Sequence, residues 1–186
     1  MHAVAAAALL LSFAHAAQAQ QQTIVLEDGT SNYDLAGRVM VLEDKSRSLT
    51  PAEVLSGAAD ARFSAPPNSE LNYSFSRSAY WVRFTLENRA SHIAMWILVI
   101  PYPVIDSAVL YCRSGTGGII EIKNGDSLPF RDRPIASNNL AYVVPQKTGE
   151  TQTYYLKVTS NNSIVIPMEI MSAREFAKRS STEQMI

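Results

Sequence analysis

The stretch Tyr80-Trp81-Val82-Arg83-Phe84-Thr85-Leu86-Glu87 alternates strictly between two kinds of side chain. Successive side chains of a β-strand point to opposite faces, so a period of two predicts a strand with one buried face. We expect the core-facing set to be Tyr80, Val82, Phe84 and Leu86. The opposite face then carries Trp81, Arg83, Thr85 and Glu87.

Tryptophan on an outer face is unusual, because leaving it in water is costly. One interpretation is that a loop or a second element packs over Trp81. The other is a ligand platform, in which the indole stacks on a sugar and Arg83 holds hydroxyl or carboxylate groups. On the second interpretation, replacing Trp81 or Arg83 by alanine abolishes the ligand response and changes the free energy of unfolding by less than ~1 kcal/mol.

The same period of two recurs along the chain, with short turn-forming segments between the apolar runs. These runs are the predicted strands 23–26, 38–43, 71–76, 80–88, 93–100, 104–113, 119–123, 140–145, 152–159 and 164–171. Many short strands, with helical patterns only in peripheral segments, predict an all-β antiparallel sandwich. In strand 152–159, Tyr155 and Lys157 point outward, so pairing with strand 80–88 would join the two outer faces.

Two peripheral helices are expected. Thr50-Pro51-Ala52-Glu53 combines an N-cap, a proline at the first helical position and a capping-box glutamate, which predicts a helix ending near Gly57. Residues 172–183 are polar and permit a helix after the last strand.

The chain begins with an apolar run that ends in Ala17-Gln18-Ala19, which is typical of a cleaved signal peptide over residues 1–19. We therefore expect residues 20–186 to form a single exported domain. The last residues, Gln184-Met185-Ile186, suggest that the natural chain continues into a membrane helix.

Charge and composition exclude several function classes. Sixteen basic and seventeen acidic residues are scattered without runs, so no nucleic-acid partner is expected. After signal cleavage His92 and Cys112 stand alone, which supports neither a zinc site nor a Ser-His-Asp set, and no cofactor or metal is expected. A catalytic pair among Asp106, Asp126 and Asp132 would need a separation that sequence does not give. We expect a domain that is not an enzyme.

The loop 124–139 is long for a compact β domain and dense in charge and proline. Such loops often carry function. In the alternative, Asp126 and Asp132 pair with Arg131 or Arg133 and brace the loop. Asn124, Asp126 and Asp132 offer oxygen ligands for calcium, although Asn-Gly-Asp is also an ordinary turn sequence.

Several short motifs follow one another in a recognisable order. They are Tyr80-Trp81-Val82-Arg83-Phe84, then Pro101-Tyr102-Pro103 with Asp106 and Leu110-Tyr111, then Gly125-Asp126 with Pro129-Phe130 and Arg133, then Tyr155-Leu156-Lys157-Val158. This order, spread over roughly Ile24 to Ser172, resembles the type-two extracellular domain of bacterial seven-transmembrane receptors with diverse intracellular signalling modules (7TMR-DISM).

The resemblance implies a jelly-roll-like sandwich related to carbohydrate-binding modules, standing in the periplasm before membrane helices and a cytoplasmic histidine kinase or diguanylate cyclase. Carried over position by position, it marks Trp81, Arg83, Asp106, Asp126 and Arg133 as candidate ligand-binding residues. Tyr155, on the joined outer face, completes the set. An ion pair between Asp106 and Arg133 would instead be structural.

We therefore expect a sensor domain that binds a small molecule, most plausibly a carbohydrate, and passes occupancy through residues 172–183 to the transmembrane region of the same receptor. Two alternatives remain open. The domain is a protein-interaction module that docks a partner or forms a homodimer, or it is a secreted carbohydrate-binding accessory protein.

Overall fold

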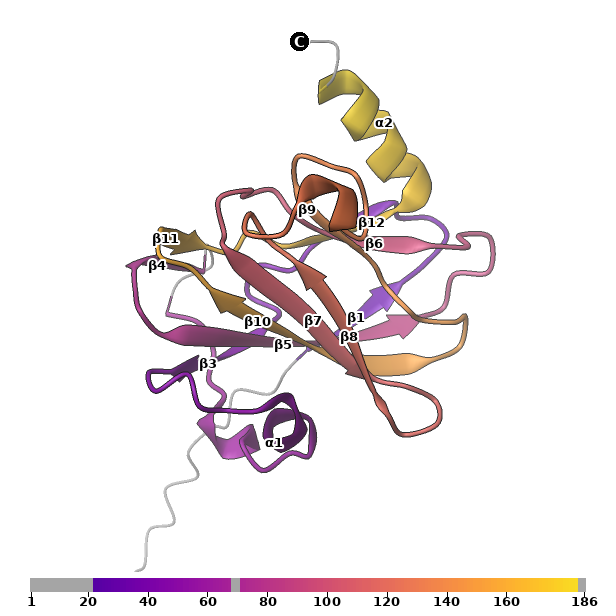
Figure 1. The fold of residues 1–186 in the computed structure, drawn as a ribbon. Coiled ribbons are helices and arrows are strands. Elements are labelled where there is room, and N and C mark those ends of the chain that lie inside the picture. The colour runs from indigo at the N-terminus through magenta and orange to yellow at the C-terminus, as the bar shows by residue number, and fades with distance from the viewer. Residues whose placement is uncertain (1–21, 68–70, 184–186) are drawn as a thin grey trace, which may run out of the picture.

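A computed structural model describes residues 22–67 and 71–183 (Figure 1). The expected signal peptide and residues 184–186 lie outside this part of the chain. The strands are β1 (Thr23–Leu26), β2 (Asn32–Asp34), β3 (Met40–Asp44), β4 (Asn72–Phe75), β5 (Ala79–Asn88), β6 (Trp96–Ile100), β7 (Ser107–Arg113), β8 (Ile119–Asn124), β9 (Leu140–Val143), β10 (Thr151–Thr159), β11 (Ser163–Val165) and β12 (Glu169–Ser172). The helices are α1 (Pro51–Leu55) and α2 (Ala173–Glu183), with short 3-10 turns η1 (Asp60–Arg62) and η2 (Phe130–Asp132).

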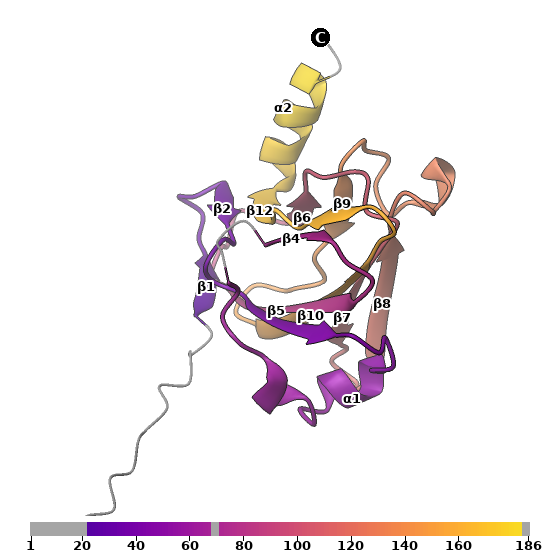
Figure 2. The same cartoon turned by 90° about the vertical axis from the view of Figure 1, so that its left-hand side faces the viewer.

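The strands form two facing layers, which confirms the predicted all-β sandwich (Figure 2). The large sheet has the order β1-β5-β10-β7-β8, with β3 also beside β5, and the small sheet has the order β2-β12-β6-β9. Strands β11 and β4 form a separate pair. The expectation of purely antiparallel pairing is wrong at one edge, because β1 runs parallel to β5.

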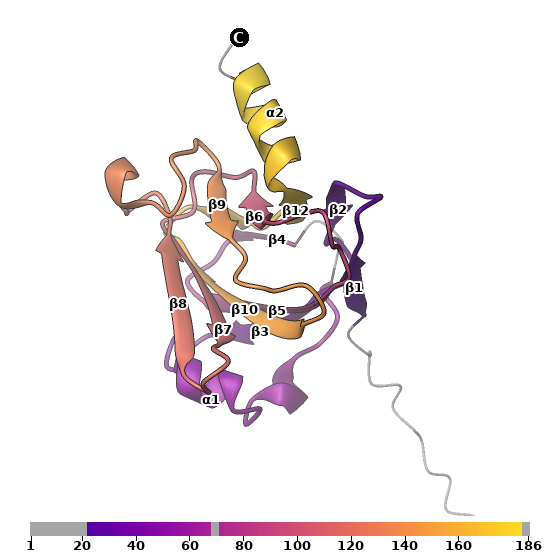
Figure 3. The same ribbon diagram turned by 90° about the vertical axis from the view of Figure 1, so that its right-hand side faces the viewer.

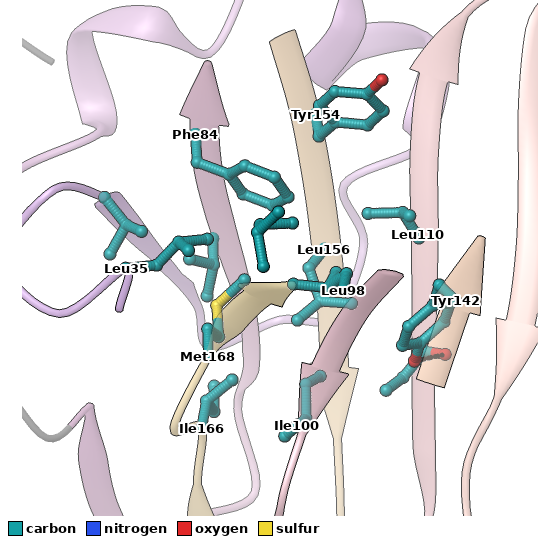
Figure 4. Close-up of a cluster of buried hydrophobic side chains, with 14 of the residues drawn as sticks. Leu35, Phe84, Leu98, Ile100, Leu110, Tyr142, Tyr154, Leu156, Ile166 and Met168 are labelled. Carbon is teal, nitrogen blue, oxygen red and sulfur yellow. Dashed lines mark hydrogen bonds between the residues drawn. The ribbon is translucent and has the colours of Figure 1, made fainter. Parts of the chain in front are cut away.

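The core lies between the two layers, as Figure 4 shows for labelled residues from both sheets. Tyr80, Val82, Phe84 and Leu86 all enter it, which confirms the inward set predicted from the alternation. Phe84 stacks on Tyr154 of β10 with ring centroids 5.4 Å apart. Burial of these large side chains is the main stabilising contribution to the sandwich.

The first predicted helix forms, and its start is fixed by the expected capping box. Thr50 Oγ1 accepts a hydrogen bond from the Glu53 amide at 3.2 Å, and the Glu53 carboxylate accepts one from the Thr50 amide at 2.8 Å. Pro51 occupies the first turn, and Gly57 follows the helix with φ +87°. Each end of α1 is therefore specified by local residues.

Several strands differ from the sequence-based prediction, and two of these differences have local causes. The predicted strand 164–171 is divided into β11 and β12 around Pro167, which has no amide to donate to a ladder. Strand β2 was missed because three residues give too short a pattern. Strand β6 begins at Trp96 and not at Ile93.

Helix α2 begins immediately after β12 and projects from the sandwich (Figure 1). Phe176 packs on the outer face of the small sheet, against Ile97, Val99 and Met171. Arg179 pairs with Glu169 of β12 at 2.7 Å and with Glu175 at 3.1 Å. None of the helices in the described part of the chain has the length and apolar composition needed to cross a membrane.

Candidate functional site

The outer faces of β5 and β10 form one continuous surface, as expected if these strands were neighbours. The two strands pair antiparallel, with Tyr155 opposite Arg83 and Lys157 opposite Trp81. Three of the six predicted site residues, Trp81, Arg83 and Tyr155, therefore lie together. Cross-strand partners point to the same face, so their side chains share one environment.

This surface is not open. Residues 45–63, which we call the cover, leave β3, form α1 and η1, and pack over it (Figures 1 and 2). Trp81 is 0% exposed, in a second apolar cluster with Val54, Leu55 and Phe63 of the cover. The interpretation that another element packs over Trp81 is confirmed, and the exposed platform is wrong. Alternation identifies the face of a side chain, but it does not reveal what covers that face.

Cations from three neighbouring strands hold the cover. Arg83 of β5 pairs with Asp60 at 2.8 Å, and its guanidinium lies 4.4 Å from the ring centroid of Phe63. Arg113 of β7 donates to the Leu55 carbonyl at 3.0 Å. Lys157 of β10 donates to the Leu49 carbonyl at 3.3 Å. The polar side chains of this face therefore fasten a structural element.

Two buried nitrogens beneath the cover remain without a hydrogen-bond partner in the described part of the chain: Trp81 Nε1 and Arg83 Nε. Tyr155 is half-buried beside them, in edge-to-face contact with Phe63 at 6.1 Å. Burial raises the pKa of the Tyr155 phenol, so it stays protonated at neutral pH. This region supplies hydrogen-bond donors, but the cover separates them from solvent.

Asp106 takes part in the hydrogen bonding of a turn. Its carboxylate accepts hydrogen bonds from the Asn161 amide at 2.7 Å, from Asn161 Nδ2 at 2.9 Å and from Asn162 Nδ2 at 3.3 Å. These bonds fix the turn between β10 and β11. The ion pair considered between Asp106 and Arg133 is not the arrangement adopted, because Arg133 Nη2 lies 3.6 Å from Asp126 Oδ1.

The loop 124–139 carries the most accessible of the predicted site residues, and its η2 turn projects from the sandwich (Figure 3). We call Asp126, Phe130 and Arg133 the loop cluster. The Arg133 side chain is only 9% exposed, whereas that of Asp126 is 62% exposed. The Arg133 guanidinium lies 5.5 Å from the Phe130 ring centroid, and Phe130 is 52% exposed.

Both ion pairs expected to brace this loop form. Arg133 pairs with Asp126 at 3.6 Å, and Arg131 pairs with Asp132 at 3.7 Å. Arg133 Nε is nevertheless buried without a hydrogen-bond partner among the residues that the structure describes. A buried guanidinium nitrogen of this kind retains the capacity to donate.

Asn124, one of the oxygen ligands considered for calcium, is hydrogen-bonded within the fold. Asn124 is buried, donates from Nδ2 to the Ala141 carbonyl at 3.1 Å, and accepts the Gly125 amide at 2.9 Å. Among residues 22–67 and 71–183, no three histidine, cysteine or carboxylate side chains are grouped so that they could hold a metal ion. Asn124 instead joins β8 to β9.

Sequence reasoning missed a cavity of about 380 Å³ at the end of β2. Its walls include Asp34, Leu71 and residues 165–168. No motif marked it, because β2 is short and the linker between β11 and β12 was predicted as part of a strand.

A family model for the 7TMR-DISM extracellular 2 domain matches residues 36–172, from just after β2 to the end of β12. The chain belongs to this family. The 7TMR-DISM extracellular 2 domain is the extracytoplasmic sensor part of a membrane receptor, so the predicted class and location are confirmed. No curated protein matches the chain. All six predicted site residues fall inside the 7TMR-DISM match.

Proposed function

We propose that this sensor domain binds a carbohydrate in the periplasm at the loop cluster. The observation that carries the proposal is the position of Arg133, whose side chain is 9% exposed, keeps an unpartnered Nε, and lies between an exposed aromatic ring and an exposed carboxylate. An ion pair between Arg133 and Asp126 that only braced the loop would not need the exposed aromatic ring of Phe130 beside it.

Carbohydrates offer two kinds of surface. The C–H face of a sugar ring packs on an aromatic ring, and Phe130 presents such a ring to solvent. Sugar hydroxyls donate to carboxylates and accept from guanidinium groups, and Asp126 and Arg133 supply both. The three residues of the loop cluster thus offer a ring for the C–H face of a sugar and charged groups for its hydroxyls.

Within this proposal the other predicted residues act through the scaffold. Trp81, Arg83 and Tyr155 anchor the cover, and Asp106 fixes the turn after β10. The domain itself performs no catalysis. Ligand occupancy is passed to the transmembrane part through α2, and it can do so only if the ligand prefers one of two receptor states. The output domain is a histidine kinase or a diguanylate cyclase.

The test begins with a glycan array probed with the purified chain, followed by calorimetric titration of the strongest glycan. We expect Phe130→Ala and Arg133→Gln each to weaken binding at least about tenfold, as loss of a stacking or charged hydrogen-bonding group does. Arg131→Gln is the matched control, because Arg131 lies on the same loop with its side chain 86% exposed. A glycan that binds all three variants equally, or an array without binding, contradicts the proposal.

A second function, docking of a partner or of a second copy, is favoured by one observation. Phe75 of β4 is 83% exposed, an unusually open position for a phenylalanine. Trp81 cannot serve a dimer, because the cover already buries it. Sedimentation velocity separates the candidates: a dimer that Phe75→Ser converts to a monomer supports docking, and a monomer at all concentrations opposes homodimerisation.

A further inference from the structure

The cavity at the end of β2 is separate from the loop cluster and shares no residue with it. Its volume of about 380 Å³ falls within the range of small-molecule sites. The walls come from Asp34, Ala36, Leu71 and residues 165–168. Apart from the carboxylate of Asp34, these side chains are apolar.

The walls are held in place before any ligand arrives. The side chains of Leu71, Ile166 and Met168 are buried and pack into the core, which fixes the main chain that lines the cavity. The Ile166 amide donates to the Leu71 carbonyl at 3.2 Å, and the Leu35 amide donates to the Met168 carbonyl at 3.0 Å. Because the main chain around the cavity is hydrogen-bonded, little ordering is needed on binding.

Asp34 gives the cavity its charge. Its Oδ1 accepts the Ala36 amide at 2.8 Å, which fixes the direction of the carboxylate. Asp34 stands directly opposite Glu169 in the β2–β12 ladder. Glu169 is neutralised by Arg179 of α2 at 2.7 Å, whereas no ion pair to Asp34 forms within residues 22–67 and 71–183. Arg179 contacts Glu169 and not Asp34, so the Asp34 carboxylate keeps its charge free to attract a cation from a ligand.

We propose that this cavity binds a small apolar amine, with its ammonium group at the Asp34 carboxylate and its hydrocarbon part against Val165 and Pro167, the half-buried apolar side chains of the wall. An apolar wall alone would accept any hydrophobic molecule, and the uncompensated carboxylate selects the positively charged one. The cavity is also close to the output helix in sequence. Met168 leads directly into β12, and β12 leads directly into α2.

The experiment titrates n-hexylamine into the purified chain at neutral pH and follows the methyl resonances of Leu71, Val165 and Ile166 by NMR. n-Hexanoate and hexan-1-ol are the matched probes, with the same chain length and a negative or no charge. We expect saturable shifts with hexylamine, weaker shifts with hexanol and none with hexanoate.

Two variants test the assignment of residues. Asp34→Asn retains an Oδ1 acceptor for the Ala36 amide, and it should weaken hexylamine binding about three- to fivefold, as loss of an exposed ion pair does, while leaving hexanol binding unchanged. Val165→Phe places a larger side chain in the cavity and should abolish binding of both probes. Val143→Phe, at an exposed position of β9 outside the cavity, is the control for folding.

Hexanoate binding as strong as that of hexylamine would overturn the assigned charge preference. Hexylamine binding that persists in Val165→Phe would overturn the assigned location. Because the loop cluster lies elsewhere, Val165→Phe should leave glycan binding unchanged, so the two proposals fail or succeed separately.

Discussion

Gly125 lies directly against the main chain of Asp106. A Cβ on Gly125 would lie 2.3 Å from the Asp106 carbonyl oxygen and 2.8 Å from the Ser107 Cα, and its φ is +137°. Two main-chain hydrogen bonds form across this close approach. The Asp126 amide donates to the Ile105 carbonyl at 2.7 Å, and the Ser127 amide donates to the Asp106 carbonyl at 3.1 Å. The Gly125-Asp126 motif therefore joins the start of the loop 124–139 to the start of β7.

The first prediction concerns this contact. Gly125→Ala should lower the free energy of unfolding by about 2 kcal/mol or more, because the new Cβ meets main-chain atoms that have no room to move. The measurement is urea denaturation followed by circular dichroism. Gly117→Ala is the matched control, with φ +85° and open space around its Cβ, and should cost only about 1 kcal/mol. Equal losses would mean that the close approach has no energetic effect.

The second prediction reverses an expectation drawn from the sequence. Trp81→Ala should lower the free energy of unfolding by about 3–5 kcal/mol, because it opens a cavity beneath the cover. The sequence-based platform predicted less than ~1 kcal/mol. Phe130→Ala, at an exposed aromatic, is the comparison and should change stability by no more than about 0.5 kcal/mol. Denaturation curves that coincide for Trp81→Ala and the wild type would contradict the buried position.

The third prediction concerns pH. The Asp28 carboxylate accepts hydrogen bonds from the amides of Ser91, His92 and Ile93 and from the Ser91 hydroxyl. The Ser91 amide, followed by the His92 amide, lowers the Asp28 pKa from 3.8 to about 2. A depressed pKa in the folded state means that this contribution to stability is complete above the unfolded pKa and is lost as pH falls towards about 2.

Stability of Asp28→Asn should therefore fall less steeply than that of the wild type between about pH 4 and pH 2. Denaturant unfolding at a series of pH values gives both slopes. The pKa itself follows from an NMR titration of the Asp28 carboxyl carbon. A titration midpoint close to the ordinary value of 3.8 would show that the four hydrogen bonds do not favour the charged form.

The fourth prediction concerns the attachment of α2. Phe176→Ala should increase amide hydrogen exchange throughout α2 and leave exchange in β5 and β10 unchanged, because Phe176, with the smaller Ala173, packs the helix on the small sheet. Lys178→Ala, at an exposed position of the same helix, is the control. If α2 exchanges equally in both variants, then the ion pairs of Arg179 with Glu169 and Glu175 suffice to hold it.

The sandwich could be predicted in large part because its signals are local. The alternation at residues 80–87 identified the core-facing side of β5, and the capping box at Thr50 and Glu53 located α1. Prediction failed where the local pattern is short or interrupted. Three residues of β2 show no usable period, and Pro167 ended a strand that apolar composition alone extended.

The candidate site was harder to predict because it depends on contacts between distant segments. The sequence placed Trp81 and Arg83 on one face correctly, but Phe63, which covers that face, comes from a segment whose packing leaves no periodic trace. The proximity of Asp126, Phe130 and Arg133 followed from one long loop and was easier to anticipate. Asp34 could not be singled out from the sequence, because its importance depends on Glu169, which lies opposite it on the distant strand β12.

Because no linker separates β12 from α2, a movement of the small sheet would be transmitted directly to the helix. Ser172 ends the strand and Ala173 begins the helix, so no residue separates the two elements. Eleven helical residues extend about 16 Å. A tilt of the small sheet by about 10° would displace the far end of such a lever by about 3 Å, a shift comparable with the piston and rocking steps by which helices pass between packed states.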